Sequence, residues 1–165
     1  MNTQAKKHYD AMKRHLEAGN DEEAFVELER AYRSDPQSVR LNFECGELAV
    51  ESEEWQAGFN YLSLAISYNN QRIELQTLEL IGAFKLIGEC SAGLGDNNLA
   101  QAFLSVAFSF FTQNYKQEDD EELYEEIMDA IMDAMSEIDG EDESIVNKYL
   151  EVMQTSFPMP HSITG

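Results

Sequence analysis

The chain has few of the residues that build disulfides, secretory signals or membrane spans. Its 165 residues include only two cysteines, Cys45 and Cys90, and both lie within helical patterns. This argues against a disulfide framework and favours thiols in a reducing cytoplasm. No apolar run is long enough to span a bilayer, and residues 1–10 lack the apolar core of a secretory signal. We therefore expect a cytoplasmic protein.

The sequence also lacks the motifs of an enzyme. Its three histidines, His8, His15 and His161, are too few and too scattered to act with either cysteine. It has no glycine-rich phosphate loop and no nucleophile elbow. The acidic segment 137–143 lacks the alternating oxygen ligands of a calcium loop. We expect no catalytic residue, no metal site and no cofactor.

Basic residues are scarce, with 11 Lys and Arg against 32 Asp and Glu, which gives a net charge of −21. Residues 1–116 hold 10 basic and 17 acidic side chains, and residues 117–165 hold 1 basic and 15 acidic. Such a field repels phosphate backbones and anionic lipid, which argues against nucleic-acid and membrane partners. It would attract a cationic partner, although acidic helices commonly serve only solubility.

What the sequence does contain is a pattern of mostly small residues that recurs three times. Each copy has three aligned residues: the first lies upstream, the second opens a later segment, and the third closes that segment. The three sets are Met12, Ala24 and Ala31; Gly46, Gly58 and Ala65; and Gly88, Ala100 and Ala107. The opening residues are spaced by 34 and then by 42 residues. Such a period is typical of a helical repeat array, in which each helix pair needs neighbours to bury its apolar face.

Apolar periodicity predicts helices throughout, and no segment alternates with the period of two of a half-buried strand. The first helix is expected from Gln4 to Ala18, the fifth from about Arg72 to Ala92, and the sixth from Asn97 to about Thr112. The length of the fifth helix would absorb the eight residues by which the second spacing exceeds the first. Helix ends are expected at Gly19, Gly93 and Gly95, and N-caps at Asn20, Ser38 and Asp96.

The repeat resembles the tetratricopeptide repeat, a helix pair with a tight turn, an early and a late alanine in its second helix and often a final proline. Residues 5–36 match through AGNDEEAFVELERAYRSDP, residues 39–70 through Gly46, Trp55 and Ala65, and residues 81–112 through Gly88, GLGDNNLA and Ala107. The resemblance implies an all-α, right-handed superhelical array of three such pairs within residues 1–116, with one continuous interior.

Residues 117–165 are expected to form an acidic helical hairpin and a short tail. The hairpin would act as a degenerate fourth repeat or cap, because the sixth helix is apolar nearly all round and would otherwise stay exposed. A methionine-rich edge is expected to join this core, or alternatively to form an adaptable partner surface: Met128, Met132, Met135 and Met153.

The resemblance also implies a concave groove, lined by the first helix of each pair, that holds an extended or helical peptide. The residues carried over to this groove are Lys6, Tyr9, Lys13, Leu16, Arg40, Phe43, Glu47, Val50, Gly82, Lys85 and Glu89. Four of them are cations, which would suit an acidic peptide with an apolar anchor. Alternatively, these cations are surface residues that balance neighbouring glutamates.

The Lys, Asn and Arg set with which some family members grip the carboxylate ends of chaperone tails is absent. Its places are taken by Tyr9, Lys13, Glu44, Gly82 and Leu86. We therefore expect a non-catalytic protein–protein interaction scaffold, an adaptor or chaperone, whose partner is another protein or peptide. Two alternatives remain. One is an acidic nucleic-acid mimic that blocks a basic protein through residues 117–143. The other is a self-associating module, such as a homodimer built through the sixth helix or the methionine edge.

Overall fold

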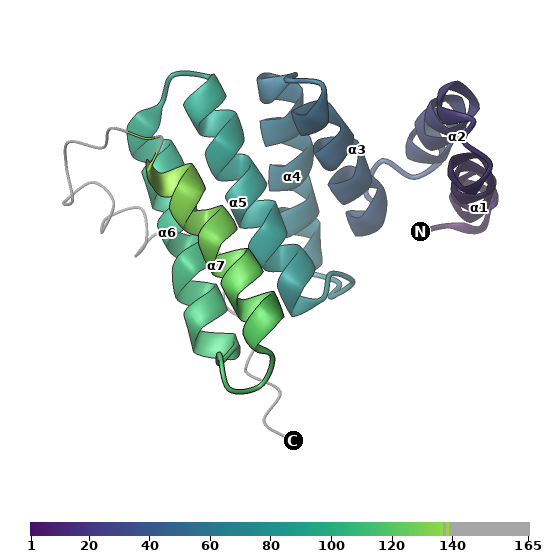
Figure 1. Cartoon of the computed structure of the whole chain (residues 1–165). Coiled ribbons are helices and arrows are strands. Elements are labelled where there is room, and N and C mark those ends of the chain that lie inside the picture. Colours follow the sequence, from purple (N-terminus) through teal and green to yellow (C-terminus); the bar gives the residue numbers. More distant parts are fainter. Residues whose placement is uncertain (137, 139–165) are drawn as a thin grey trace.

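The computed structural model describes residues 1–136 and 138 and is all-α within them (Figure 1). The helices are α1 Thr3–Glu17, α2 Asp21–Ser34, α3 Val39–Glu51, α4 Trp55–Asn69, α5 Thr77–Gly93, α6 Asn97–Asn114 and α7 Glu121–Ser136. The helix expected over residues 144–157 and the tail lie outside the described residues. Among the described residues, no helix is both long and apolar enough to cross a membrane.

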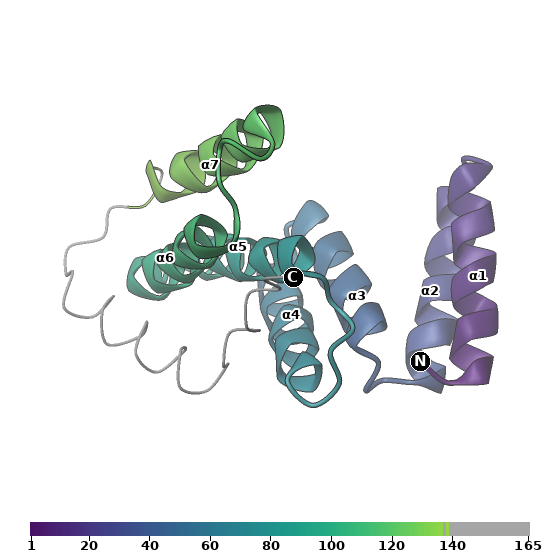
Figure 2. The same cartoon turned by 90° about the horizontal axis from the view of Figure 1, so that it is seen from below.

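Consecutive helices pack as hairpins, α1 with α2, α3 with α4, and α5 with α6, and α7 lies against α6 (Figures 1 and 2). The predicted all-α helical-repeat fold is therefore confirmed. Ala31, Ala65 and Ala107, the small residues that close each copy of the repeat, are all 0% exposed. The handedness of the array and its domain boundaries stay predictions.

The predicted close approach of helices at small residues is present in the second and third pairs. A Cβ added to Gly46 would lie 2.5 Å from Cγ of Leu62, and one added to Gly88 would lie 2.8 Å from Cγ of Leu104. Since real Cβ atoms do not approach other atoms so closely, each glycine sets the spacing of its helix pair.

Local signals place most helix ends where the sequence predicts them. Gly19 and Gly95 have φ of +72° and +82°, the left-handed geometry that ends a helix. Ser38 and Asp96 each accept a hydrogen bond from a backbone N–H in the first turn of their helices. The expected N-cap at Asn20 is wrong in one respect, because its side chain makes no capping hydrogen bond.

The expected start of the fifth helix at Arg72 is wrong, since α5 begins at Thr77. Oδ1 of Asn69 accepts hydrogen bonds from the backbone N–H groups of Glu74 and Leu75, at 2.8 and 2.9 Å. These bonds hold the preceding residues in a loop. The helix then starts where the N–H of Gln76 donates to the Glu79 carboxylate at 2.8 Å. The eight additional residues of the second spacing are therefore divided between helix and loop. Compared with α3, α5 is four residues longer and the loop before it is three residues longer, and α4 extends one residue further than α2.

The expected continuous interior is also wrong, because the buried apolar residues form two clusters. One cluster joins α1 and α2 and includes Leu41 of α3, and the other extends from α3 to α7. The first pair meets the second near the turn that follows α2, where the rings of Tyr32 and Tyr61 lie edge to face at 5.3 Å. Nδ2 of Asn42 braces this turn by donating to the carbonyls of Pro36 and Ser38, each at 2.9 Å.

The apolar side of α7 covers α6. Ile131 is 0% exposed, and Met128 and Met135 pack against the larger cluster. The ring of Tyr124 lies 4.9 Å from that of Phe111 of α6. Met132 is exposed, and Met153 lies outside the described residues.

Candidate functional site

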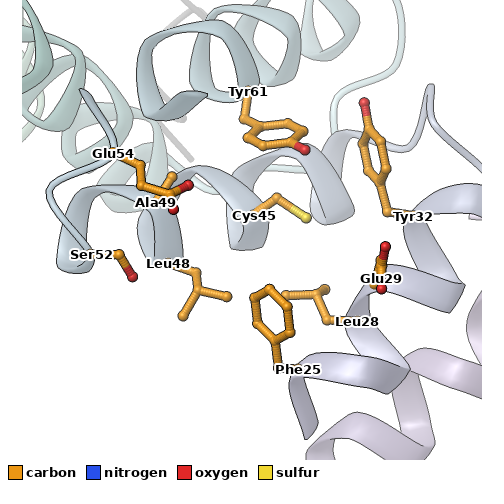
Figure 3. Close-up of a pocket in the computed structure, with 10 residues that line it drawn as sticks. All are labelled: Phe25, Leu28, Glu29, Tyr32, Cys45, Leu48, Ala49, Ser52, Glu54 and Tyr61. Atoms are coloured by element: carbon orange, nitrogen blue, oxygen red, sulfur yellow. The ribbon is translucent and has the colours of Figure 1, made fainter. Parts of the chain in front are cut away.

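Two cavities lie along the seam between α2 and α3. The first has a volume of about 260 Å³ and is bounded by α2, α3, the turn between α3 and α4, and Tyr61 of α4 (Figure 3). The second has a volume of about 300 Å³ and is bounded by α1, α2 and α3. Phe25, Leu28 and Leu48 line both cavities. We call the two cavities together the inter-pair cleft.

The floor of the inter-pair cleft is apolar and includes two exposed side chains. The side chain of Phe25 extends from α2 toward α3, beside Leu48 (Figure 3). It is 56% exposed, and Leu16, which lines the second cavity, is 52% exposed. A contiguous open apolar surface of this kind marks an interaction site more often than an isolated exposed residue does.

The rim of the inter-pair cleft is acidic. Its carboxylates are Asp21, Glu29, Glu44, Glu47, Glu51 and Glu54, and no described lysine or arginine lines either cavity. Within residues 1–136, Glu29 alone among these six forms an ion pair, with Arg33. Glu44 accepts a hydrogen bond of 2.6 Å from the hydroxyl of Tyr9.

Burial raises the pKa of two groups at the inter-pair cleft. It raises the pKa of Glu47 from 4.5 to about 7, and repulsion from Glu44 and Glu51 adds to the effect. Burial also raises the pKa of the Cys45 thiol to about 12. Cys45 is therefore protonated at neutral pH and is a poor nucleophile.

The groove residues predicted on α1 lie near one another but are engaged within the chain. Lys6 is exposed and pairs with Asp10 at 3.2 Å. Tyr9 is buried, and burial followed by its bond to Glu44 raises its pKa well above the usual value. Nζ of Lys13 lies 4.8 Å from the centre of the Tyr9 ring, within cation–π distance.

The residues predicted on α3 and α5 are divided between core and surface. Phe43 is 5% exposed and belongs to the larger core cluster. Arg40 donates to both carboxylate oxygens of Glu79, at 2.5 and 3.0 Å. This bond holds the pKa of Glu79 below its usual range.

Three further predicted residues, Val50, Lys85 and Glu89, line a third cavity of about 490 Å³ bounded by α3 to α7. Lys85 forms an ion pair with Glu89. Gly82 is half-buried and has no heavy atom within 4 Å of an added Cβ. The structure thus brings Val50, Lys85 and Glu89 together, whereas Leu16 and Glu47 lie in the inter-pair cleft. Whether any of the predicted groove residues binds a partner stays a prediction.

The sequence interpretation missed the inter-pair cleft itself. Phe25 follows Ala24, which shares one helical face with Leu28 and Ala31 at steps of four and three. A bulky apolar residue one step off that face lies at its edge. That position was the available signal for an apolar side chain at the seam.

The fold defines an all-α helical-repeat protein. The chain is similar to the N-terminal domain of stress-induced protein-1 (STI-1) from C. elegans, with a TM-score of 0.55 and 16% sequence identity. The match covers 79% of this chain and 98% of that chain, and at this identity it shows the fold alone. This likeness supports a fold of the tetratricopeptide-repeat kind. No family model matches the sequence, and no curated protein matches it significantly.

Proposed function

We propose that this chain is a non-catalytic protein-interaction module that binds a segment of a partner protein by taking an apolar side chain into the inter-pair cleft. The observation that carries the proposal is Phe25, a large aromatic side chain that is 56% exposed between two cavities. Cavities of about 260 and 300 Å³ lie at the lower end of the ~300–1,000 Å³ range of small-molecule pockets. They suit an inserted side chain better than a whole helix.

The next helix pair supports the proposal, because there the same repeat position is filled. The first repeat spacing places Phe59 in the position of Phe25, and Phe59 packs edge to face on Phe103 of α6 at 6.1 Å. By the second repeat spacing of 42 residues, Tyr61 holds in α4 the position that Phe103 holds in α6. Tyr61 contacts Tyr32 instead, and Phe25 and Tyr61 both line the first cavity. The space that a ring fills between the second and third pairs is open at the first seam.

Burial of apolar side chains would supply part of the binding free energy. Fully burying one Leu or Phe side chain contributes roughly 1.5–3 kcal/mol, and the partner would also cover Phe25. The second cavity contains Leu16 and Glu47, two of the residues expected in the concave groove. A peptide lying along α1 and α3 could therefore reach the inter-pair cleft.

The non-catalytic part of the proposal is supported by the state of the reactive groups. Cys45 is held as the thiol by burial. Nδ1 of His8 lies 2.6 Å from Oε2 of Glu27 and does not line the inter-pair cleft. The described lining residues of the inter-pair cleft therefore include neither a thiolate nor an imidazole.

Peptide selection tests the proposal and does not require an identified partner. Peptides would be selected from a random display library on the immobilised full chain, and their affinities measured by fluorescence anisotropy. We expect Phe25→Ser to weaken binding by at least about tenfold, the loss of one buried apolar contact. Ile73→Ser is the matched control, because Ile73 is 77% exposed and lies outside the cleft. Equal binding by wild type and Phe25→Ser would contradict the proposal. Dependence on Lys85 and Glu89 would instead place the site in the third cavity.

The alternative of an acidic nucleic-acid mimic has one observation in its favour. On α7, exposed carboxylates recur at every fourth residue: Glu121, Glu125, Asp129 and Asp133. Competition separates the two functions. Double-stranded DNA should displace the partner of a mimic, but it should not displace a peptide whose binding depends on Phe25.

A further inference from the structure

We propose that the segment taken into the inter-pair cleft is cationic and amphipathic, with an apolar side chain that inserts beside Phe25 and flanking Lys or Arg residues that meet the acidic rim. This inference rests on the proposed function and specifies its partner class. The charge of this segment is opposite in sign to that of the acidic peptide that the sequence suggests for the concave groove.

The carboxylates of the rim come from three parts of the chain. Glu44, Glu47 and Glu51 follow one another at steps of three and four, so they form a row along one face of α3. Asp21 and Glu29 of α2 and Glu54 at the start of α4 complete the rim. Cations on both sides of an inserted apolar residue would therefore find carboxylates from more than one helix.

Within residues 1–136, the rim carboxylates have almost no ion-pair partners. Glu29 is the one rim carboxylate with an ion pair there, and its partner Arg33 is 75% exposed, so that pair is easily exchanged. Glu47 lies between Glu44 and Glu51, and repulsion from both adds to burial in raising its pKa. A partner cation would relieve this repulsion.

The cations expected to receive an acidic partner already have partners within the chain. Lys6 pairs with Asp10, Arg40 with Glu79, and Lys85 with Glu89. Lys13 lies over the Tyr9 ring. An acidic peptide would compete with these contacts, whereas a cationic peptide at the inter-pair cleft would compete with the exposed pair of Glu29 and the hydrogen bond from Tyr9 to Glu44.

Three synthetic helical peptides test the charge preference. They share one leucine face and carry Lys, Gln or Glu at the polar positions, and the full chain is titrated into each labelled peptide at about 50 and about 300 mM salt. We expect the Lys peptide to bind at least about tenfold more tightly than the Gln peptide, and the Glu peptide to bind least. The preference should shrink at the higher salt, where the screening length is shorter.

Two variants with the same loss of charge show where the preference arises. Glu44→Gln, Glu47→Gln and Glu51→Gln together should weaken the Lys peptide about tenfold. In Glu44→Gln the new amide oxygen could still accept the hydrogen bond from Tyr9, and removing the repulsion should not harm the fold. Glu121→Gln, Glu125→Gln and Glu126→Gln together, all exposed on α7, should leave the affinity nearly unchanged.

The outcomes separate this inference from the proposed function. Equal binding of all three peptides, with loss in Phe25→Ser, would overturn the charge preference and keep the site. Equal weakening by both triple variants would show general attraction and overturn the acidic rim as its source. Failure of the Lys peptide to bind overturns the inference, and peptide binding unaffected by Phe25→Ser overturns the proposed function. A dimer by sedimentation that Phe25→Ser dissociates would make a second copy the occupant and overturn the cationic segment.

Discussion

The two seams between successive helix pairs differ in how closely their helices pack. Between α4 and α5, a Cβ added to Gly58 would lie 2.9 Å from Sγ of Cys90, and one added to Gly93 would lie 2.4 Å from the Trp55 ring. Between α2 and α3, cavities of about 260 and 300 Å³ remain. The third cavity also borders the second seam, through Trp55 and Gly93, but there the helices themselves stay in contact, and α6 and α7 complete the lining. A repeat array can thus pack one seam closely and leave the next less filled while keeping the same helix-pair plan.

The difference between the seams is sharpest at equivalent phenylalanines. We expect Phe59→Ala to lower the free energy of unfolding by about 2–4 kcal/mol, because it removes a core contact and an edge-to-face ring pair. Phe25→Ala should cost less than about 1 kcal/mol, because the side chain is 56% exposed. Urea unfolding followed by circular dichroism measures both. Equal losses would mean that the first seam is as closely packed as the second.

Added side-chain volume should destabilise the protein more at the closely packed seam than at the open one. Gly58→Val should cost about 1–3 kcal/mol, because the new methyl groups meet Cys90 and Val50. Ala24 holds the equivalent repeat position in α2 and is 2% exposed, but it also lines the second cavity, so Ala24→Val should cost less than Gly58→Val. Thermal unfolding of the two variants provides the comparison. A larger loss for Ala24→Val would contradict the account.

The open seam should also carry a pH signature. Because the pKa of Glu47 is raised to about 7 in the folded state, its proton is bound more tightly there than in the unfolded chain. The stabilisation that the protonated Glu47 contributes is thus fully present below pH 4.5. It falls as the pH rises toward 7 and is absent above pH 7. Glu47→Gln should raise the free energy of unfolding at pH 8 by about 1–2 kcal/mol, a value discounted for partial exposure, and should change it little at about pH 4.5.

The control for this effect is Glu122→Gln, which removes one exposed charge on α7. A stabilisation by Glu47→Gln that is the same at about pH 4.5 and about pH 8 would show that the side-chain volume or net charge matters, and not the buried carboxylate.

The sequence was sufficient for the parts of the fold that depend on local pattern. Small residues predicted the close helix contacts, and Ser38 and Asp96 predicted two N-caps, because each effect involves neighbouring residues of one or two helices. The start of α5 could not be predicted in this way. It depends on the Asn69 side chain reaching the N–H groups of Glu74 and Leu75, which leaves no mark in the apolar period.

The candidate site was predictable only in part. The Lys85–Glu89 pair has the spacing of neighbours on a helix and could have been read from the sequence. The Arg40–Glu79 pair joins residues 39 apart and could not. The angle between α2 and α3 likewise follows from how whole faces pack, so neither the division of the core nor the exposure of Phe25 follows from periodicity.

The most direct measurement is a chemical-shift titration of the isotope-labelled full chain with the Lys peptide. We predict that the largest shifts fall on residues that line the inter-pair cleft, in particular Phe25, Leu28 and Leu48. Shifts confined to Lys85, Glu89 and Asp133 of the third cavity, with Phe25, Leu28 and Leu48 unaffected, would contradict the account.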